Sequence, residues 1–301
     1  MTDTESPAGV FRLLSDDIRI DILEALAIAQ HEADSLGSGP VELTFSDIYQ
    51  RIDVDNTSKL SYHLGELVGP ILRKTENGYS FTHAGEKLIR LVLADNYEHP
   101  PEFAPIEING ECIYCGCTSL QASLRFQFFI VTCKGCEQPL SGHPVTPTLL
   151  RAYDGSQLVD MVSKKMALEY RQIREGLCIG CTGSLSTTII DSEELPVETP
   201  SSFLVHDECN HCLREYNGPL VYGVAYHPAS VAFHWEHGIN LSTKGMWELH
   251  QFKDQWMAEQ LSTAPAEYRV VMRRDPEELH VYLDADVTVT RTERVRGRAV
   301  K

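Results

Sequence analysis

The cysteines of this 301-residue chain are confined to one segment, from Cys112 to Cys212. Eight of the nine form four Cys-x2-Cys pairs, and such spacing strongly limits how the chain around them folds. The pairs are Cys112 and Cys115, Cys133 and Cys136, Cys178 and Cys181, and Cys209 and Cys212. Because the first residues are polar and acidic rather than signal-like, we expect metal sites here and not a disulfide framework.

The spacing between the pairs is typical of zinc ribbons. Seventeen residues (116–132) separate the first two pairs, and 27 residues (182–208) separate the last two. Each pair directs two thiolates at one point, and four thiolates complete a closed tetrahedral shell. We therefore predict two structural Zn²⁺ sites. Redox-active dithiols and iron–sulfur clusters are the alternatives, although no thioredoxin-like βαβ pattern surrounds the motifs.

The cysteine region also contains an internal repeat. The first pair recurs 66 residues later, and the strand-like run before Cys133 recurs before Cys209, which indicates a duplicated module. We predict a first ribbon with its helix at 106–176, a second ribbon with its helix at 177–262, and a β-hairpin with a basic tail at 263–301. The expected helices cover 156–174 and 247–256, and the expected tail strands cover 268–272, 279–283 and 287–291.

The remaining metal-binding residue types are interpreted as structural. Cys117 is the odd thiol, and a sensing role is its alternative interpretation. His227, His234 and His237 suit packing within a strand and a helix better than a metal site. Shells made only of cysteine leave no open position for water. We find no nucleophile motif, phosphate loop or catalytic carboxylate pair, so we predict a binding protein and not an enzyme.

The first 97 residues contain helix, turn and hairpin patterns in a recognisable order. Ser15, followed by two aspartates, predicts a helix start, and a second helix is expected at 44–52. After a turn at 53–56, a third helix would direct Leu60, Leu64 and Leu67 inward. Its other faces would carry the exposed residues Ser58, Lys59, Ser61, Tyr62 and His63.

Asn77-Gly78 between two short β-prone runs predicts a hairpin in which both turn residues have positive φ. Thr82 would then cap a last helix over 82–97. The apolar stripe expected on that helix consists of Ala84, Leu88, Leu91 and Val92.

This order is that of a winged helix-turn-helix domain, so the predicted fold class is α+β, with two zinc-ribbon-like modules after residues 1–97. Residues 13–23 (LLSDDIRIDIL), 58–64 (SKLSYHL) and 78–82 (GYSFT) resemble the opening, recognition helix and wing of ArsR-type regulators. The specific likeness is to a haloarchaeal branch with zinc ribbons behind the winged helix. It covers about the first 90 residues and, by pattern, the cysteine region. Metal-sensing members carry thiolates near the recognition helix, and this chain has none there.

The resemblance implies a DNA-binding transcriptional regulator that acts as a homodimer on double-stranded DNA, with the helix at 82–97 as pairing surface. The expected DNA contacts are Thr57, Ser58, Lys59, Ser61, Tyr62, His63, Arg73 and Lys74. The alternatives are a basal-transcription or RNA polymerase adaptor, a protein-docking module, and a zinc or redox sensor.

The net charge of −17 argues at first against a nucleic-acid partner. However, residues 56–90 carry five basic and three acidic groups, although residues 1–100 carry eight and 17. At ~1 M salt the Debye length is only ~3 Å, so distant acids barely repel a phosphate. A halophilic cytoplasm would reconcile the charge with DNA binding, and the excess of Arg (17) over Lys (9) fits it. Because no apolar run is long enough for a membrane helix, we expect a cytoplasmic protein without a membrane partner.

Overall fold

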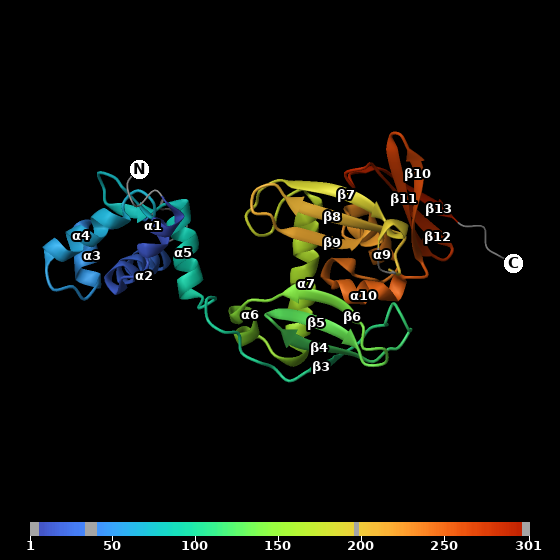
Figure 1. Cartoon of the computed structure of the whole chain (residues 1–301), viewed down its shortest axis with the longest axis horizontal. Helices are drawn as coiled ribbons and strands as arrows, with labels where there is room; N and C mark the ends of the chain where they lie inside the picture. The colour runs from blue at the N-terminus through green and yellow to red at the C-terminus, as the bar shows by residue number, and fades with distance from the viewer. Residues whose placement is uncertain (1–5, 34–40, 196–198, 297–301) are drawn as a thin grey trace. The chain divides into compact units, whose positions relative to one another are not determined.

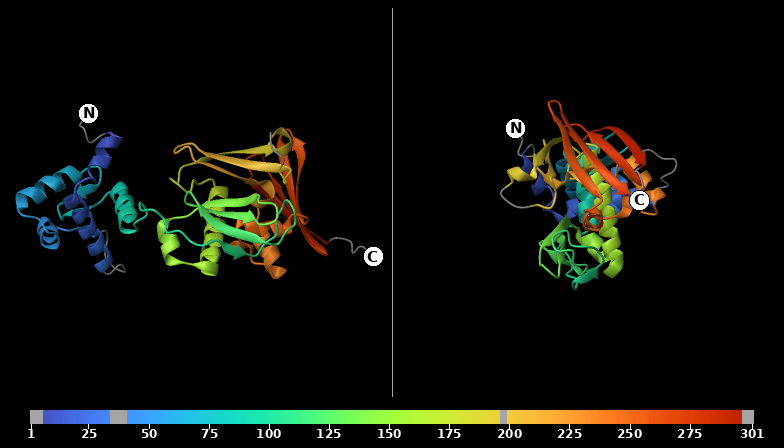
Figure 2. Two further views of the ribbon diagram at one scale, coloured as in Figure 1. Left: turned by 60° about the horizontal axis from the view of Figure 1, so that its bottom comes forward. Right: turned by 90° about the vertical axis from the view of Figure 1, so that its right-hand side faces the viewer.

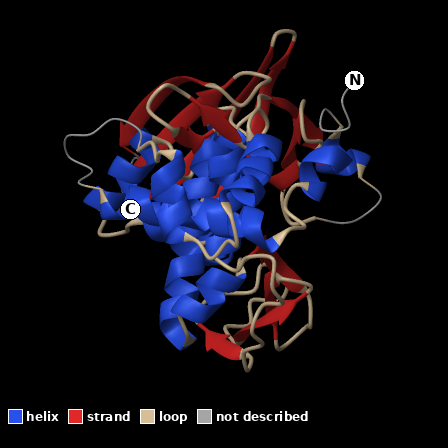
Figure 3. Ribbon diagram, turned by 90° about the vertical axis from the view of Figure 1, so that its left-hand side faces the viewer, coloured by secondary structure: helices blue, strands red, loops and turns tan. Residues whose placement is uncertain are grey.

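A computed structural model describes residues 6–33, 41–195 and 199–296, and it divides the chain into two compact units, Met1–Pro100 and Pro101–Lys301. Both helices and small antiparallel sheets are present (Figures 1 and 3), which confirms the α+β prediction. The end of the expected basic tail, 297–301, and part of the expected loop of the second ribbon, 196–198, lie outside the described residues.

The first unit consists of helices around one apolar core and a two-stranded hairpin. Its elements are α1 (Pro7–Arg12), α2 (Asp17–Glu32), α3 (Phe45–Arg51), α4 (Thr57–Leu67), β1 (Leu72–Lys74), β2 (Tyr79–Phe81) and α5 (His83–Leu93). Strands β1 and β2 are antiparallel, and Leu43 forms a further antiparallel bridge to Tyr79. Leu60, Leu64 and Leu67 are buried as predicted.

Polar side chains mark the helix starts. Thr44 and Asp47 form a capping box at α3, with each side chain bonded to the other residue's backbone N–H. The expected cap at Ser15 is wrong: Asp16 accepts the N–H of Arg19 at 3.4 Å and caps α2. The Ser15 hydroxyl instead donates to the carbonyl of Arg12, one turn earlier in the chain, at 2.7 Å.

The hairpin forms as predicted, but its turn differs. Lys74 pairs with Tyr79, so the loop has four residues, and the Thr75 N–H donates to the Gly78 carbonyl at 2.8 Å. Only Gly78 has a positive φ, of 149°, so the prediction for Asn77 is wrong. A Cβ at Gly78 would lie 2.3 Å from the Leu43 carbonyl oxygen, which makes glycine necessary there.

The apolar stripe expected on helix α5 is correct only in part, since Leu88 and Val92 pack against the core as expected. Gly85 and Ile89 are buried, whereas Ala84 and Leu91 are exposed, and the helix ends at Leu93 instead of residue 97. The reason is close packing at its start: a Cβ on Gly85 would lie 2.2 Å from the carbonyl oxygen of Ile71. The absence of a side chain at Gly85 therefore allows this approach and sets which face turns inward.

The described part of the second unit contains three antiparallel sheets. The first has β3 (Ile106–Ile108), β4 (Leu120–Arg125), β5 (Phe128–Cys133) and β6 (Pro139–Pro144); the second has β7 (Leu185–Asp191), β8 (Phe203–Cys209) and β9 (Glu215–Pro219). The third has β10 (Trp256–Thr263), β11 (Ala266–Arg274), β12 (Glu277–Leu283) and β13 (Val289–Arg296). Figure 2 shows this last sheet as a twisted layer near the C-terminus.

The helices of the second unit are α6 (Pro147–Ala152), α7 (Gly155–Arg174), α8 (Leu220–Gly223), α9 (Pro228–Glu236) and α10 (Met246–Leu249). Helix α7, predicted over 156–174, lies between the first and second sheets (Figure 1). Its Leu158 and Val162 pack in the core of the first sheet, and its Tyr170 packs in the core that the other two sheets share. This helix therefore joins the core of the first sheet to the core of the other two.

The helix expected over 247–256 is only partly correct. After α10 comes a 3-10 turn (His250–Phe252), and Trp256 begins strand β10. Strands β10 and β11 form one hairpin, and the expected boundary between residues 262 and 263 falls in it. The spacing of Trp247, Phe252 and Trp256 resembles a helical stripe, but all three side chains enter the interior from different elements. The strands expected in the tail are present as β11, β12 and β13, although β13 begins at Val289 and not at residue 287, and extends to Arg296.

Candidate functional sites

The four Cys-x2-Cys loops share one backbone arrangement. In each loop, the N–H of the first cysteine donates to the carbonyl five residues later, and its own carbonyl accepts the N–H four residues later. The residue at that fourth position always has a positive φ, between 59° and 72°. These residues are Gly116, Glu137, Thr182 and Leu213. Three of the four loops thus hold a non-glycine residue in a costly conformation that keeps two sulfurs on one side.

The loops bring the eight predicted cysteines together in two groups of four. In each group the sulfurs lie within 4.8 Å of one another. The closest sulfur pairs, such as Cys112 with Cys136 and Cys181 with Cys209, are 3.6 and 3.5 Å apart. A tetrahedron with metal–sulfur bonds of about 2.3 Å has edges of about 3.8 Å, so each group could hold one metal ion.

Backbone N–H groups point at the sulfurs and favour their thiolate forms. Burial raises the pKa of Cys133, but the N–H groups of Cys136 and Gly135, together with hydrogen bonds from Cys115 and Cys112, lower it to about 6. The pKa of its partner Cys115 is raised in turn, to about 12. Burial likewise raises the pKa of Cys178, and there the Tyr216 hydroxyl and two N–H groups lower it to about 6. Such outer hydrogen bonds are usual around metal-bound thiolates.

The two centres are built by equivalent elements, which confirms the predicted repeat. Leu120 pairs with Cys133 across β4 and β5, and Leu185 pairs with Cys209 across β7 and β8. The difference lies in the connections: residues 126–127 join β4 to β5, whereas residues 192–202 join β7 to β8. The second ribbon therefore has the longer connection, as its spacing predicts.

The remaining cysteine and the three histidines lie outside both groups. The Cys117 sulfur accepts the N–H of Ser119 at 3.4 Å. In His227, His234 and His237, the Nδ1 atom bonds to backbone within α9, to Ala229 N, Ser230 O and Phe233 O, respectively. Each ring is thus held by its own helix turn, and no metal-binding group of the described residues includes one.

Comparison with known families follows this division of the chain. Residues 109–289, well over half of the chain, match the family described as "Domain of unknown function (DUF7351)". The chain belongs to the DUF7351 family. The matched DUF7351 segment contains both cysteine groups. Residues 7–92 match a second family, described as "Domain of unknown function (DUF7347)". No curated protein and no solved structure matches the chain.

Before the DUF7351 segment, one side of α4 presents polar residues to solvent. Its exposed residues include Thr57, Ser58, Lys59, Ser61 and Tyr62. Lys59 forms an ion pair with Asp55 at 3.0 Å. On the hairpin, Arg73 donates to the Ser80 hydroxyl at 3.0 Å, and the Lys74 ammonium lies 5.5 Å from the centre of the Tyr79 ring.

The expectation that His63 is exposed on α4 is wrong. His63 is only 5% exposed, because it lies next to Leu60, Leu64 and Leu67 on the buried side of the helix. Its Nδ1 accepts from Arg19 Nε at 3.4 Å and lies 3.5 Å from an Asp16 oxygen. His63 therefore joins α4 to the start of α2 and is not available to a partner.

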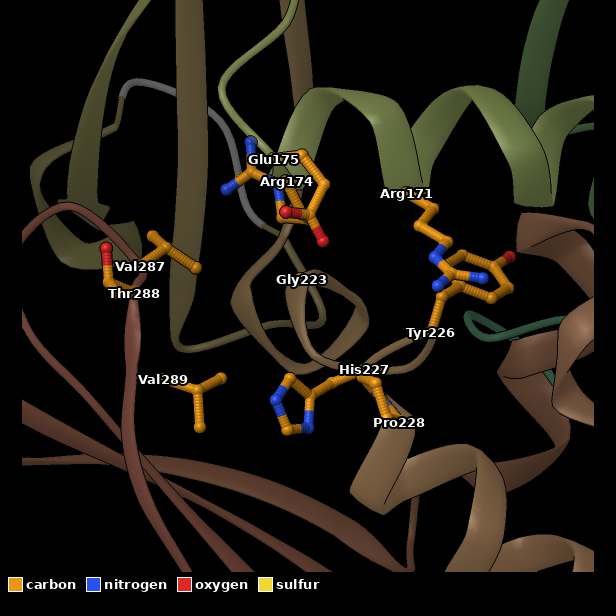
Figure 4. Close-up of a pocket in the computed structure, with 10 residues that line it drawn as sticks. All are labelled: Arg171, Arg174, Glu175, Gly223, Tyr226, His227, Pro228, Val287, Thr288 and Val289. Carbon is orange, nitrogen blue, oxygen red and sulfur yellow. The ribbon is translucent and has the colours of Figure 1, made fainter.

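The DUF7351 segment also contains a cavity that sequence reasoning missed. It lies between the end of α7, the start of α9 and the segment before β13, and Figure 4 shows its lining residues. Arg171, Glu175, His227 and Val287 come from three distant segments, so no local motif could have revealed it. Among the described residues, no helix is long and apolar enough to cross a membrane.

Proposed function

We propose that this protein is a sequence-specific, DNA-binding transcriptional regulator with a winged helix-turn-helix domain in its first unit. In this proposal α4 is the recognition helix that enters the major groove, and β1–β2 is the wing beside the backbone. The observation that carries it is the two-sided character of α4. Its leucines are buried, while a continuous polar surface with Lys59 and Tyr62 faces solvent.

The basic residues of this surface suit phosphate contacts. Among the described residues, Arg73 and Lys74 have no carboxylate partner, and both are exposed on the hairpin. Lys59 is held by the exposed Asp55. An exposed ion pair of this kind contributes little, so a DNA phosphate could replace Asp55 at small cost. Thr57, Ser58 and Ser61 add hydroxyl donors along the same side of the helix.

We propose that each group of four cysteines binds one structural Zn²⁺ ion. Zinc accepts four thiolates in a closed tetrahedral shell, and the sulfur spacing fits that shell. A bound ion would hold the two loops of each ribbon together. It would leave no free coordination position, which supports a binding function for this chain rather than hydrolysis.

The proposed regulator acts as a homodimer on two-fold DNA sites. Near the end of α5, Leu91, Leu93 and Tyr97 are 45%, 44% and 64% exposed. These side chains are large, and they lie within the segment 82–97 that the resemblance assigns to pairing, with Tyr97 beyond the end of α5. A second copy of the chain would cover them.

The test is selection of bound duplexes from a random pool, with metal-loaded protein, followed by affinity measurements on the selected site. Lys59→Ala and Arg73→Ala should each weaken binding about tenfold or more. Lys164→Ala, at an exposed lysine of α7 in the second unit, is the matched control and should bind like the native protein. Asp55→Asn should strengthen binding, because it releases Lys59 and removes a negative charge.

Two outcomes would contradict this proposal. A pool that yields no enriched sequence would exclude sequence-specific recognition. Binding that Lys59→Ala and Arg73→Ala leave unchanged would favour the adaptor function, in which the first unit docks on the transcription machinery.

A further inference from the structure

The cavity at the end of α7 opens beside a wider trough. The cavity has a volume of about 240 Å³ and the trough, between α7 and α9, has one of about 570 Å³. Arg171, Tyr226 and Pro228 line both. Together they provide a charged end and an adjoining, more apolar space, within the size range of small-molecule sites.

Most charged groups at this site are already paired. Arg174 forms an ion pair with the buried Asp207, which also accepts the Thr187 hydroxyl at 2.7 Å. Glu236 forms two hydrogen bonds with Arg294, at 2.6 and 3.0 Å. These contacts leave little free charge on Arg174 and Glu236 for a ligand.

Two groups of opposite sign are left over. Among the described residues, neither Arg171 nor Glu175 forms an ion pair or a side-chain hydrogen bond. They lie four positions apart at the end of α7, and both line the cavity (Figure 4). His227 stands opposite them, at the start of α9, where burial lowers its pKa more than the charge of nearby Glu175 raises it. The free charges of the cavity are therefore one cation and one anion.

The adjoining trough exposes two large apolar side chains. Leu168 of α7 is 66% exposed and Trp235 of α9 is 64% exposed, and both line the trough with Val231 and Ala232. Burying such surface is favourable by about 25 cal/mol for each Å². A ligand that covers them would thus gain affinity from an apolar part as well as from charge.

The cavity wall contains a conformation that is unfavourable by itself. Val287 has a φ of 60°, although β-branched residues rarely adopt positive φ. Strain of this kind often accompanies ligand sites. The turn is held by the Asp284 side chain, which accepts the N–H groups of Asp286 and Thr288 at 3.0 and 2.9 Å.

We propose that this site binds a small zwitterion, an α-amino acid with a large apolar side chain. Arg171 pairs with the carboxylate, Glu175 pairs with the ammonium group, and the side chain lies in the trough against Leu168 and Trp235. A simple organic anion would leave Glu175 unpaired, and a simple amine would leave Arg171 unpaired. The proposal is independent of DNA binding, because it concerns only residues of the second unit.

The test uses L-phenylalanine as the probe, with full-length, metal-loaded protein. Calorimetry should show saturable binding, and covering Trp235 should shift its emission to shorter wavelength. Two analogues each lack one charge: 3-phenylpropionate and 2-phenylethylamine. Each should bind at least tenfold more weakly than L-phenylalanine. The proposal is overturned if L-phenylalanine shows no saturable binding up to the millimolar range. It is also overturned if either analogue binds as tightly as L-phenylalanine.

Variants separate the two charge contacts. Arg171→Gln should weaken binding of L-phenylalanine about tenfold, so that this variant binds L-phenylalanine no more tightly than 2-phenylethylamine. Glu175→Gln should bind L-phenylalanine no more tightly than 3-phenylpropionate. Arg125→Gln, at an exposed arginine of β4 that lines neither the cavity nor the trough, is the matched control and should bind like the native protein. If all three variants bind L-phenylalanine with the affinity of the native protein and their circular dichroism is unchanged, Arg171 and Glu175 do not form the site.

Discussion

At the scale of single residues, close backbone contacts and buried polar groups decide the details of this structure. Cysteine positions were predictable, because a metal shell requires fixed spacing and the pattern occurs four times. The burial of His63 was not predictable. Histidine is usually found at the protein surface, but position 63 lies on the same side of α4 as the buried leucines. Likewise, nothing local to Gly85 indicates that the carbonyl of Ile71 will approach it.

Two glycines of the first unit provide a matched test. Gly78→Ala should destabilise the protein by more than about 1 kcal/mol, because its Cβ would meet the Leu43 carbonyl oxygen at 2.3 Å. Gly65→Ala should stabilise it by about 0.5–1 kcal/mol, since Gly65 is exposed in α4 with no heavy atom within 4 Å. Urea unfolding midpoints measure both. A stabilising Gly78→Ala would contradict the turn described above.

His250 should make stability depend on pH. Burial, with a contribution from Lys253, lowers its pKa to about 4, below the ~6.5 of an unfolded histidine. Between these values the unfolded chain binds a proton that the folded protein excludes. Stability therefore falls as the pH falls from about 6.5 to about 4, by up to ~1.4 kcal/mol per pH unit from this group.

His250→Phe should make that part of the pH profile less steep, leaving the contribution of His234, whose pKa burial also lowers to about 4. Phenylalanine retains the ring stacked on Tyr222 and removes a buried Nδ1 atom that has no hydrogen-bond partner. Stability at pH 7 should therefore change little or increase. Denaturant unfolding at several pH values gives the slope, and an unchanged slope would show that another group titrates.

At the scale of elements, the repeated loops and α4 were predictable from local pattern, whereas the start of the third sheet was not. The cap at Thr82 acts within one turn, so the sequence shows it directly, whereas the choice between Ser15 and Asp16 at the start of α2 was not predictable in this way. Trp256 could end a helix or begin a strand, because its burial depends on a core formed by distant elements. The cavity beside Arg171 depends in the same way on three separate segments.

Loss of one cysteine ligand should remove one metal ion. Purified protein should contain two Zn²⁺ per chain that resist mild chelation, and Cys133→Ser should contain one, because Cys133 is fully buried within the first group. Cys117→Ser is the matched control and should retain two, since Cys117 lies outside the group. The metal content is measured by atomic emission. Iron in native protein, or one ion in Cys117→Ser, would contradict the assignment.

At the scale of the whole molecule, a solvent of high salt concentration would reconcile the negative charge with the proposed DNA binding. A chain with a net charge of −17 should repel DNA in dilute buffer. In molar salt this repulsion is screened within ~3 Å, and only contacts at the α4 and hairpin surface remain effective. The interpretation of the chain as a halophilic regulator depends on this difference between long-range repulsion, which salt screens, and direct contacts, which it does not.

DNA binding should consequently tolerate molar salt. We expect the affinity for the selected site to change little between about 1 and 2 M KCl, unlike that of a typical basic DNA-binding protein. Fluorescence anisotropy across a salt series measures this. A steep loss of affinity with salt would show that many released counterions drive binding, and would contradict the halophilic interpretation.

The most direct test of the proposed function is genome-wide occupancy of the native protein in its own cells, compared with that of Lys59→Ala. The account predicts discrete peaks at promoters that share a two-fold sequence, and their loss in the variant. Signal that follows RNA polymerase along transcribed genes, and persists in Lys59→Ala, would contradict it.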